Sequence, residues 1–451
     1  MRLVVLGGGG FRVPLVFQAL LDDAAASPGS AVTELVLHDL DPARLATVGA
    51  VLARQAEAAT GPVPRVRTET DLVAAVTGAD FVFSAIRVGG LAGRVCDERA
   101  ALDVGVLGQE TTGAGGVTYG LRTVPVAVHV ARTVQQHAPD AFVINFTNPA
   151  GMVTEAMAEV LGDRVVGICD SPVGMFKRVA RVLGVDHERA FFDYAGLNHL
   201  GWLRRVVVDG EDLLPRFLAD PAAMLRTEEG RLFDPSWLTS LGAVPNEYLW
   251  YWYYNREAVE AIAHAGETRG EYLARQQGDF YDGGTEGDAL ARWVRTRRDR
   301  EESYMADSRD ASGAGAREEE DLDGGGYDRV ALQLMRAIAR DEPATLVLNV
   351  PNRGLLAGLD TDAVVEVPCV VDAGGPRPLE VSPLDAAAQG LVTTVKAVER
   401  ATIEAALSGS RAGAVKALAL HPLVDSVTSA RTIVETHLSR LPDLARVLVR
   451  P

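Results

Sequence analysis

Two residue types that bind divalent metals stand close together in the middle of the sequence. Cys169 and Asp170 directly follow the apolar run RVVGI (164–168), and His199 lies thirty residues after the cysteine, in GLNHLGWL. A thiolate and a neutral imidazole are a common ligand pair for such metals. Taken one at a time, a buried inert thiol and a histidine satisfied within a β-turn are the more usual interpretations. Two protein ligands also leave coordination positions open, so a metal held here would be free to bind substrate oxygens.

A glycine-rich turn near the N-terminus has the composition of a loop that binds a dinucleotide phosphate. It places three glycines between an apolar run and a helical pattern: Gly7, Gly9 and Gly10. Glycines allow a pyrophosphate to approach the amides at a helix N-terminus. Arg12 stands where the third glycine of the usual motif would be, but Asp39 ends the next apolar run, where a carboxylate binds the ribose diol of NAD. The alternative is a glycine turn with an unrelated surface aspartate.

Further polar residues follow other apolar runs. Arg87 and Arg94 follow one of them, Asn148 lies near the end of another, and Glu110 belongs to the glycine-rich segment 106–123. Arginines usually lie on a solvated face, but several at one sheet edge would form a phosphate cradle. The Asn148 amide suits a sugar hydroxyl, or its segment simply caps the next helix. For Glu110 the alternative is an ordinary loop that leads into a helix.

These residues meet only if the first 170 residues form a parallel sheet. Short β-branched runs occur there at 3–7, 33–39, 79–86, 141–149 and 164–170. Apolar residues at helical spacing fill the intervals at 14–26, 41–59, 122–138 and 151–162. Such alternation predicts an α/β fold with helices on both faces of the sheet, so that the carboxyl ends of the strands share one edge.

The pattern changes after residue 170. We predict an N-terminal Rossmann-like domain over 1–170 and an α+β domain over 171–451 that carries substrate and metal residues. Within the second part, 189–213 favours antiparallel strands. The segment 300–326 is polar, acidic and rich in glycine, which predicts a mobile loop that could act as a lid.

The composition argues against several partners. The net charge is −17 without a run of five basic residues, so neither nucleic acid nor a membrane surface is an expected partner. No stretch of eighteen apolar residues and no signal-peptide pattern is present. Three widely spaced cysteines offer no disulfide framework, and we therefore expect a cytoplasmic protein.

Taken in order, these motifs resemble one family, the NAD- and divalent-metal-dependent glycosidases of glycoside hydrolase family 4. The resemblance covers nearly the whole chain, through GGGGFRVP, IRVGGLAGR, GQETTGAGG, NFTNPAGMVTEA, GICDSPVG, GLNHLGW, YLWYWYY, LNVPNRG and ALALHPLV. This family is an exception to the two-carboxylate scheme of most glycosidases. Within it, the segments are most similar to those of the 6-phospho-β-glucosidases.

The resemblance implies a role for each candidate residue. Cys169 and His199 would bind a divalent metal, typically Mn²⁺, and Asp170 matches the general acid of the α-glycoside members, whereas many β-members carry asparagine. Tyr248 matches the catalytic base, and Tyr251 is the other candidate in the same aromatic run. The implied NAD contacts are Gly7, Gly9, Gly10, Phe11 and Asp39. The implied substrate contacts are Arg94 and Arg269 for a phosphate, with Glu110, Asn148 and Asn198.

The implied reaction is hydrolysis without net redox change: oxidation at sugar C3, deprotonation at C2, elimination, addition of water and re-reduction by the same cofactor. The expected substrate is a 6-phospho-β-glucoside. Asp170 keeps a 6-phospho-α-glucosidase or another family-4 glycosidase open. A plain NAD-dependent 2-hydroxy-acid dehydrogenase and a non-enzymatic NAD sensor are the remaining alternatives. Large apolar helices in the C-terminal half predict a homodimer or homotetramer.

Overall fold

The first 170 residues form the parallel strands expected of them in the computed structural model, which describes residues 1–27, 29, 31–318 and 326–450. The strands pair in parallel in the spatial order β3-β2-β1-β4-β5-β6. This is the Rossmann order, so the α/β prediction is confirmed. The bounds are β1 (Arg2–Leu6), β2 (Glu34–His38), β3 (Arg65–Glu69), β4 (Phe81–Ser84), β5 (Phe142–Asn145) and β6 (Val165–Ile168).

Alternate residues of these strands enter two cores, one on each face of the sheet. Val5 of β1 packs with α1, α2 and α7, whereas its neighbour Val4 packs with α3, α5 and α6. Burial on both faces explains why the central strands are almost wholly apolar. The helix bounds are α1 (Val13–Ala26), α2 (Pro42–Glu57), α3 (Leu72–Val76), α4 (Gly90–Leu102), α5 (Ala114–His137), α6 (Ala150–Leu161) and α7 (Ser171–Leu183).

The sheet continues past residue 170 with antiparallel strands, as the pattern over 189–213 predicted. Leu348 of β11 pairs with Ile168 of β6, so one 13-stranded sheet runs through both predicted domains in the described part of the chain. The order beyond β6 is β11-β12-β7-β8-β10, with β13 on β12 and β9 on β8. The bounds are β7 (Phe191–Leu197), β8 (Leu200–Val208), β9 (Glu211–Asp212), β10 (Val244–Pro245), β11 (Ala344–Pro351), β12 (Val364–Asp372) and β13 (Gly375–Pro378).

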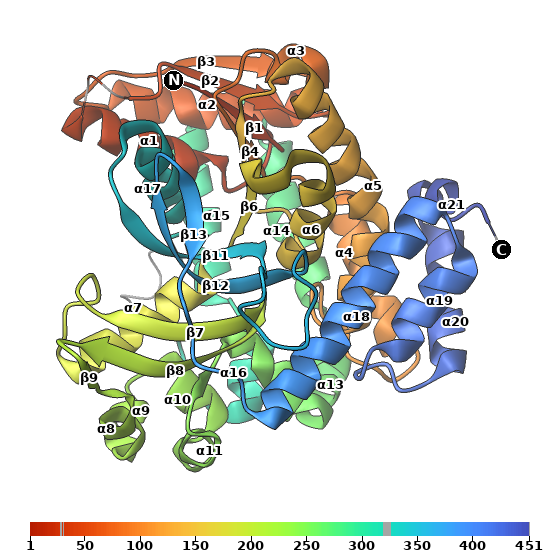
Figure 1. Ribbon diagram of the computed structural model, residues 1–451. Helices are drawn as coiled ribbons and strands as arrows, with labels where there is room; N and C mark the ends of the chain where they lie inside the picture. Colours follow the sequence, from red (N-terminus) through yellow and green to blue (C-terminus); the bar gives the residue numbers. More distant parts are fainter. Residues whose placement is uncertain (28, 30, 319–325, 451) are drawn as a thin grey trace.

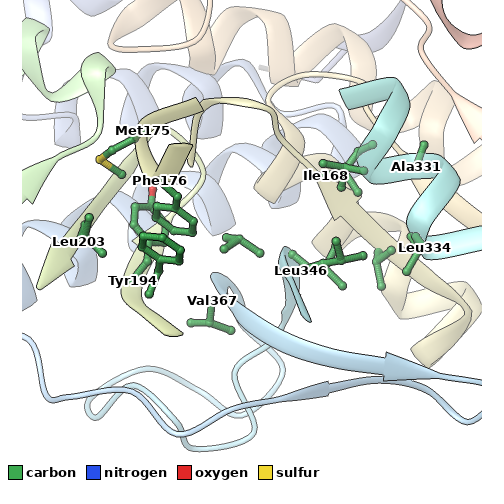
Figure 2. Packing of buried hydrophobic residues seen from close by; sticks show 14 of the residues in the cluster. Ile168, Met175, Phe176, Tyr194, Leu203, Ala331, Leu334, Leu346 and Val367 are labelled. Carbon is green, nitrogen blue, oxygen red and sulfur yellow. The ribbon is translucent and has the colours of Figure 1, made fainter. Parts of the chain in front are cut away.

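Apolar side chains join the two halves of this sheet. Figure 2 shows Ile168 of β6 beside Leu346 of β11 and Leu334 of α17, and a second group formed by Phe176 and Tyr194. All of these side chains are buried. The junction between the parallel and antiparallel strands is therefore part of a continuous core, which holds the end of β6 rigidly.

The remaining helices surround this frame, and α18 to α21, blue in Figure 1, pack against α4 to α6. In the described part of the chain, none of the helices has the length and apolar character needed to cross a bilayer. The bounds of the first group are α8 (Leu214–Leu218), α9 (Pro221–Met224), α10 (Glu228–Phe233), α11 (Pro235–Leu241), α12 (Trp250–Tyr253), α13 (Asn255–His264), α14 (Arg269–Asp282) and α15 (Ala289–Glu302). Those of the second are α16 (Ala306–Ser312), α17 (Tyr327–Arg340), α18 (Ala386–Ser408), α19 (Arg411–Leu420), α20 (Val427–Arg440) and α21 (Pro442–Val447). The 3₁₀ turns η2 (Gly162–Arg164) and η3 (Glu247–Leu249) are short.

The prediction of a loop over 300–326 is wrong for part of that segment. Helix α15 continues to Glu302 and α16 occupies Ala306–Ser312, while 319–325 lie outside the described residues. Arg309 is buried and donates to the backbone carbonyls of Glu302 and Tyr304. A buried arginine thus packs in the interior of this segment, whereas the sequence criteria for a helix expect apolar residues at buried positions.

Candidate active site

A cavity of about 980 Å³ lies at the carboxyl edge of the parallel strands, where ligands bind in this architecture. Residues that follow β1, β2, β4, β5 and β6 line it, and the antiparallel half contributes His199 from the β7–β8 turn. Tyr248 enters from η3, Arg300 from the end of α15, and Tyr304 from the turn that follows α15. The fold therefore brings the separate sequence motifs into one space.

The glycine loop at one end of the cavity has no room for side chains. Gly7 has a φ of +82°, and a Cβ on it would lie 2.5 Å from the carbonyl oxygen of Ala85. The Gly9 amide donates to Asp39 Oδ2 at 3.0 Å, which attaches the loop to the end of β2. Of the predicted cofactor contacts, all but Gly9 line the cavity: Gly7, Gly10, Phe11 and Asp39. The loop has the shape and the carboxylate that a dinucleotide requires.

Two helices of the second half, α14 and α15, bind this loop through side-chain hydrogen bonds, a contact that the sequence did not predict. The Tyr281 hydroxyl donates to the Gly9 carbonyl at 2.7 Å, and Trp293 Nε1 donates to the Phe11 carbonyl at 2.8 Å. The Arg44 guanidinium lies 4.1 Å from the centroid of the Tyr281 ring. These partners lie more than 270 residues from the loop in sequence, so no local pattern could indicate them.

Cys169 and Asp170 lie between the end of β6 and the start of α7. Cys169 is buried, and burial together with the charges of Glu366 and Asp170 raises the pKa of its thiol well above the ordinary value. Asp170 is the residue before α7 and lies 3.7 Å from Arg12 Nη1. Both residues line the cavity. A divalent cation would supply the positive charge that a thiolate at this position requires.

His199 occupies the tight β7–β8 turn with a φ of +62° and faces the same cavity. Its Nδ1 lies 3.0 Å from Thr111 Oγ1, whose hydroxyl donates to Gln109 Oε1 at 3.2 Å. The contact with Thr111 engages Nδ1, so Nε2 is the ring nitrogen left for a metal. Burial lowers the pKa of His199 to about 4, so its ring is neutral at pH 7. This is the form that binds a metal.

The described residues contain no group of three or more histidine, cysteine, aspartate or glutamate side chains arranged to hold a metal ion. Cys169 and His199 line the same cavity without belonging to a closed protein cage among the described residues. Such a pair suits a metal that completes its coordination with substrate oxygens and water.

Tyr248 lies directly on the imidazole of His199. The two rings are stacked with centroids 3.7 Å apart and 5° between their planes. Burial and the charge of Glu247 raise the pKa of Tyr248 well above its ordinary value. Tyr251, the other candidate base, does not line the cavity, and its hydroxyl accepts from Ser308. The geometry thus favours Tyr248 of the two.

Glu110 is a fully paired carboxylate at the cavity wall. Arg87 Nη1 donates to it at 2.8 Å, and Arg94 Nη1 lies 3.0 Å from the same oxygen. Burial alone would raise the pKa of Glu110, but the two guanidinium groups outweigh it and lower the pKa to about 2. Arg94 also donates to Glu98 and does not line the cavity. Its charge is therefore already neutralised by carboxylates.

Arg269 lies behind another arginine that the sequence analysis did not select. Its guanidinium donates to Ser303 Oγ at 2.8 Å and to the Arg300 carbonyl at 3.0 Å, away from the cavity lining. Arg300 lines the cavity, and no hydrogen bond or ion pair to another described residue engages its guanidinium. Burial and the charges of Arg12 and Arg269 lower its pKa to about 9. Among these arginines, Arg300 therefore presents to the cavity a positive charge that no ion pair to a described residue neutralises.

The two predicted asparagine contacts have different places. Asn148 follows β5 and lines the cavity. Asn198 does not line it, because its Nδ2 donates to Glu366 Oε1 at 3.0 Å. Glu366 also accepts from Tyr194 at 3.0 Å and Asn349 at 3.1 Å, and burial raises its pKa to about 7. Asn198 therefore fixes the turn that carries His199 from behind.

The chain matches the model of the Family 4 glycosyl hydrolase over residues 2–185 and that of the Family 4 glycosyl hydrolase C-terminal domain over residues 194–424. The protein belongs to glycosyl hydrolase family 4. This family-4 chain is 32% identical to a Bacillus subtilis protein named probable 6-phospho-beta-glucosidase, with 98% of this chain and 97% of that protein covered.

Other similar proteins cover both anomeric specificities. The chain is 28% identical to 6-phospho-alpha-glucosidase 1 of Lacticaseibacillus paracasei, over 96% of this chain and 95% of that protein. The solved structure of a Thermotoga maritima 6-phospho-beta glucosidase, with manganese, NAD⁺ and glucose-6-phosphate, superposes with a TM-score of 0.82 and 27% identity. That match covers 98% of this chain and 99% of the other.

Proposed function

We propose that the protein hydrolyses 6-phospho-β-glucosides with the help of bound NAD⁺ and a divalent cation, of which Mn²⁺ is the first candidate. The observation that carries this proposal is the shared cavity, which joins the glycine loop, the Cys169–His199 pair and Tyr248. The names of the B. subtilis and T. maritima relatives support the substrate class, and the ligands of the T. maritima structure support the cofactors. The cytoplasmic location and the homodimer or homotetramer stay predictions.

The loop residues fit a dinucleotide. Gly7 and Gly10 leave the backbone open at the N-terminus of α1, and the acid at the end of β2 suits an unphosphorylated ribose. Cys169 and His199 fit a divalent cation, because an imidazole whose Nδ1 is already engaged by Thr111 and a buried thiol line one cavity. When bound, NAD⁺ supplies reversible oxidation at a sugar carbon and the cation supplies positive charge for sugar oxygens.

The chain's own residues would then move two protons. Tyr248, stacked on His199 and lining the cavity, takes the proton from sugar C2 as its phenolate. Asp170 donates a proton to the leaving oxygen from the start of α7. Burial disfavours ionisation of Tyr248, so its deprotonation depends on positive charge beside His199.

The phosphate of the substrate would bind Arg300. Arg94 and Arg269, the arginines implied by the family resemblance, are engaged by Glu98, Glu110 and Ser303 and lie outside the cavity lining. They would act as a second layer that raises the local positive potential around Arg300. A phosphate dianion bound to Arg300 would neutralise its positive charge, which the neighbouring arginines make unfavourable.

A 6-phospho-α-glucosidase is the second candidate, because Asp170 is an aspartate and because the L. paracasei relative acts on that anomer by name. The discriminating assay compares p-nitrophenyl α- and β-glucoside 6-phosphates with NAD⁺ and Mn²⁺, following p-nitrophenol and NADH together. We expect phenol from the β-anomer without accumulation of NADH. Faster release from the α-anomer would reverse the anomer assignment. NADH accumulation from a 2-hydroxy acid, without phenol release, would establish a dehydrogenase instead.

A further inference from the structure

A chain of hydrogen bonds leads from Tyr248 to a buried carboxylate. The Tyr304 hydroxyl donates to Glu247 Oε1 at 2.7 Å, and its oxygen lies 3.2 Å from the hydroxyl oxygen of Tyr248. The Tyr304 hydroxyl therefore bridges Glu247 Oε1 and the Tyr248 hydroxyl, and it is the group that donates to the Tyr248 oxygen when Tyr248 is ionised to act as a base. All three residues line the cavity.

We propose that Tyr304, held by Glu247, is a positioning residue that fixes the hydroxyl of Tyr248. The proposal rests on the proposed function, in which Tyr248 acts as the base. Stacking on His199 fixes the plane of the Tyr248 ring at 3.7 Å but permits it to slide in that plane. The hydrogen bond to Tyr304 supplies the missing constraint at the hydroxyl end of the ring.

Glu247 is itself anchored on the opposite side of the site. Its Oε1 also accepts from Ser171 Oγ at 3.1 Å, and its Oε2 lies 3.9 Å from Arg178 Nη2. Ser171 is the first residue of α7, directly after Asp170. The carboxylate thus ties the helix that presents the candidate acid to the hydroxyl of the candidate base. Such ties matter because small displacements of a reacting group reduce rates strongly.

Two variants separate orientation from charge. Tyr304→Phe removes the bridging hydroxyl and keeps the ring, whereas Glu247→Gln keeps an oxygen that accepts from Tyr304 and Ser171 but removes the charge. Tyr254→Phe is the matched control, because its hydroxyl is also hydrogen-bonded, to the Phe233 carbonyl, but it does not line this cavity. Circular dichroism of each variant verifies the fold.

The first arm measures kcat and KM on p-nitrophenyl β-glucoside 6-phosphate with NAD⁺ and Mn²⁺. For Tyr304→Phe we expect kcat to fall about tenfold or more while KM stays within about threefold, because positioning acts on the chemical step. Glu247→Gln should lower kcat by clearly less than Tyr304→Phe does, and Tyr254→Phe should keep kcat within about threefold of the unmodified protein. A loss of kcat in Glu247→Gln as large as that in Tyr304→Phe would overturn the proposal, since charge rather than orientation would then be required.

The second arm needs no substrate. In protein labelled with 3-fluorotyrosine, the ¹⁹F resonance of Tyr248 is identified by its loss in Tyr248→Phe, and its position reports the ring stacked beside it. We expect this resonance to move in Tyr304→Phe and to stay in Tyr254→Phe. An unmoved resonance, or an unchanged kcat in Tyr304→Phe, would refute the positioning role. If the unmodified protein hydrolyses no phosphoglucoside, the proposed function fails. The ¹⁹F measurement then decides by itself whether Tyr304 holds the ring of Tyr248.

Discussion

The ring of Tyr248 lies flat on the imidazole of His199, with their centroids 3.7 Å apart. The candidate base and a candidate metal ligand are therefore placed as one unit, although 49 residues separate them in the chain. The imidazole is held in turn by Thr111, whose Oγ1 lies 3.0 Å from His199 Nδ1. The geometry of the proton-abstracting group thus depends on how the imidazole is held.

Loss of the Thr111 hydroxyl should weaken metal binding. Thr111→Val removes the group that orients His199, and partners of a metal-ligating histidine typically contribute 10- to 100-fold to affinity, so we expect the Mn²⁺ dissociation constant to rise by about that factor. Thr112→Val is the matched control, because Thr112 binds Gln109 through its backbone amide, which the substitution keeps. Calorimetric titration of the metal-free protein measures both. Equal affinities in the two variants would contradict this role of Thr111.

Replacement of Cys169 should remove the metal and leave the fold. A serine hydroxyl is a poor ligand for a borderline-soft cation, so Cys169→Ser is expected to retain less than about a tenth of the Mn²⁺ and of the metal-dependent activity. Cys369→Ser is the control, since Cys369 is buried in β12 away from the cavity. Metal analysis and circular dichroism test both parts. Full metal content in Cys169→Ser would remove this residue from the proposed ligand pair.

The parallel half of the fold was predictable because burial on both faces leaves a plain signal. Runs such as the one just before Cys169 are apolar, short and followed by polar residues, which places those residues at one sheet edge. Strand β3 was not among the predicted runs, because at the sheet edge its sequence RVRTE has a single apolar residue, Val66. Edge strands need less burial and carry a weaker pattern.

The parts that sequence reasoning missed depend on contacts between distant segments. Glu366 meets Asn198 across 168 residues, and Trp293 meets the glycine loop across 282. Arg300 and Tyr304 fall in a segment whose polar composition predicted a loop, whereas the structure buries its arginines against carbonyls and carboxylates. Composition reports how polar a segment is but not whether its charges find partners.

Arg300 should decide affinity for a phosphorylated sugar. Charge-assisted hydrogen bonds contribute about 1.5–3 kcal/mol each, so Arg300→Met should raise KM for p-nitrophenyl β-glucoside 6-phosphate about tenfold or more. Arg298→Met, on the exposed face of the same helix, is expected to leave KM within about twofold. An unchanged KM in Arg300→Met, with a raised KM in Arg269→Met, would return the phosphate to the arginine implied by the family.

A buried histidine far from the cavity should make stability depend on pH. His437 on α20 is fully buried, and its Nε2 lies 3.0 Å from Asp97 Oδ1, while Nδ1 contacts the Ile433 carbonyl at 2.7 Å. Burial alone would lower the pKa of His437, but the hydrogen bond to Asp97, a hydrogen bond with Cys96 and the charge of Asp97 raise it to about 9. Asp97 also binds Arg122 of α5, so the imidazolium holds α20 against the Rossmann helices.

The sign follows from this raised pKa. The folded protein binds the proton more tightly than the unfolded chain, so the stabilisation is fully present below pH 6.5 and is lost as the pH rises through about 9. The size of this contribution is at most about 3 kcal/mol. We expect the free energy of unfolding, measured with urea at pH 6, 7.5 and 9, to fall with pH more steeply in the unmodified protein than in His437→Gln. His264→Gln, at an exposed position on α13, should follow the unmodified protein, and parallel curves for all three would show that the His437–Asp97 pair does not link protonation to folding.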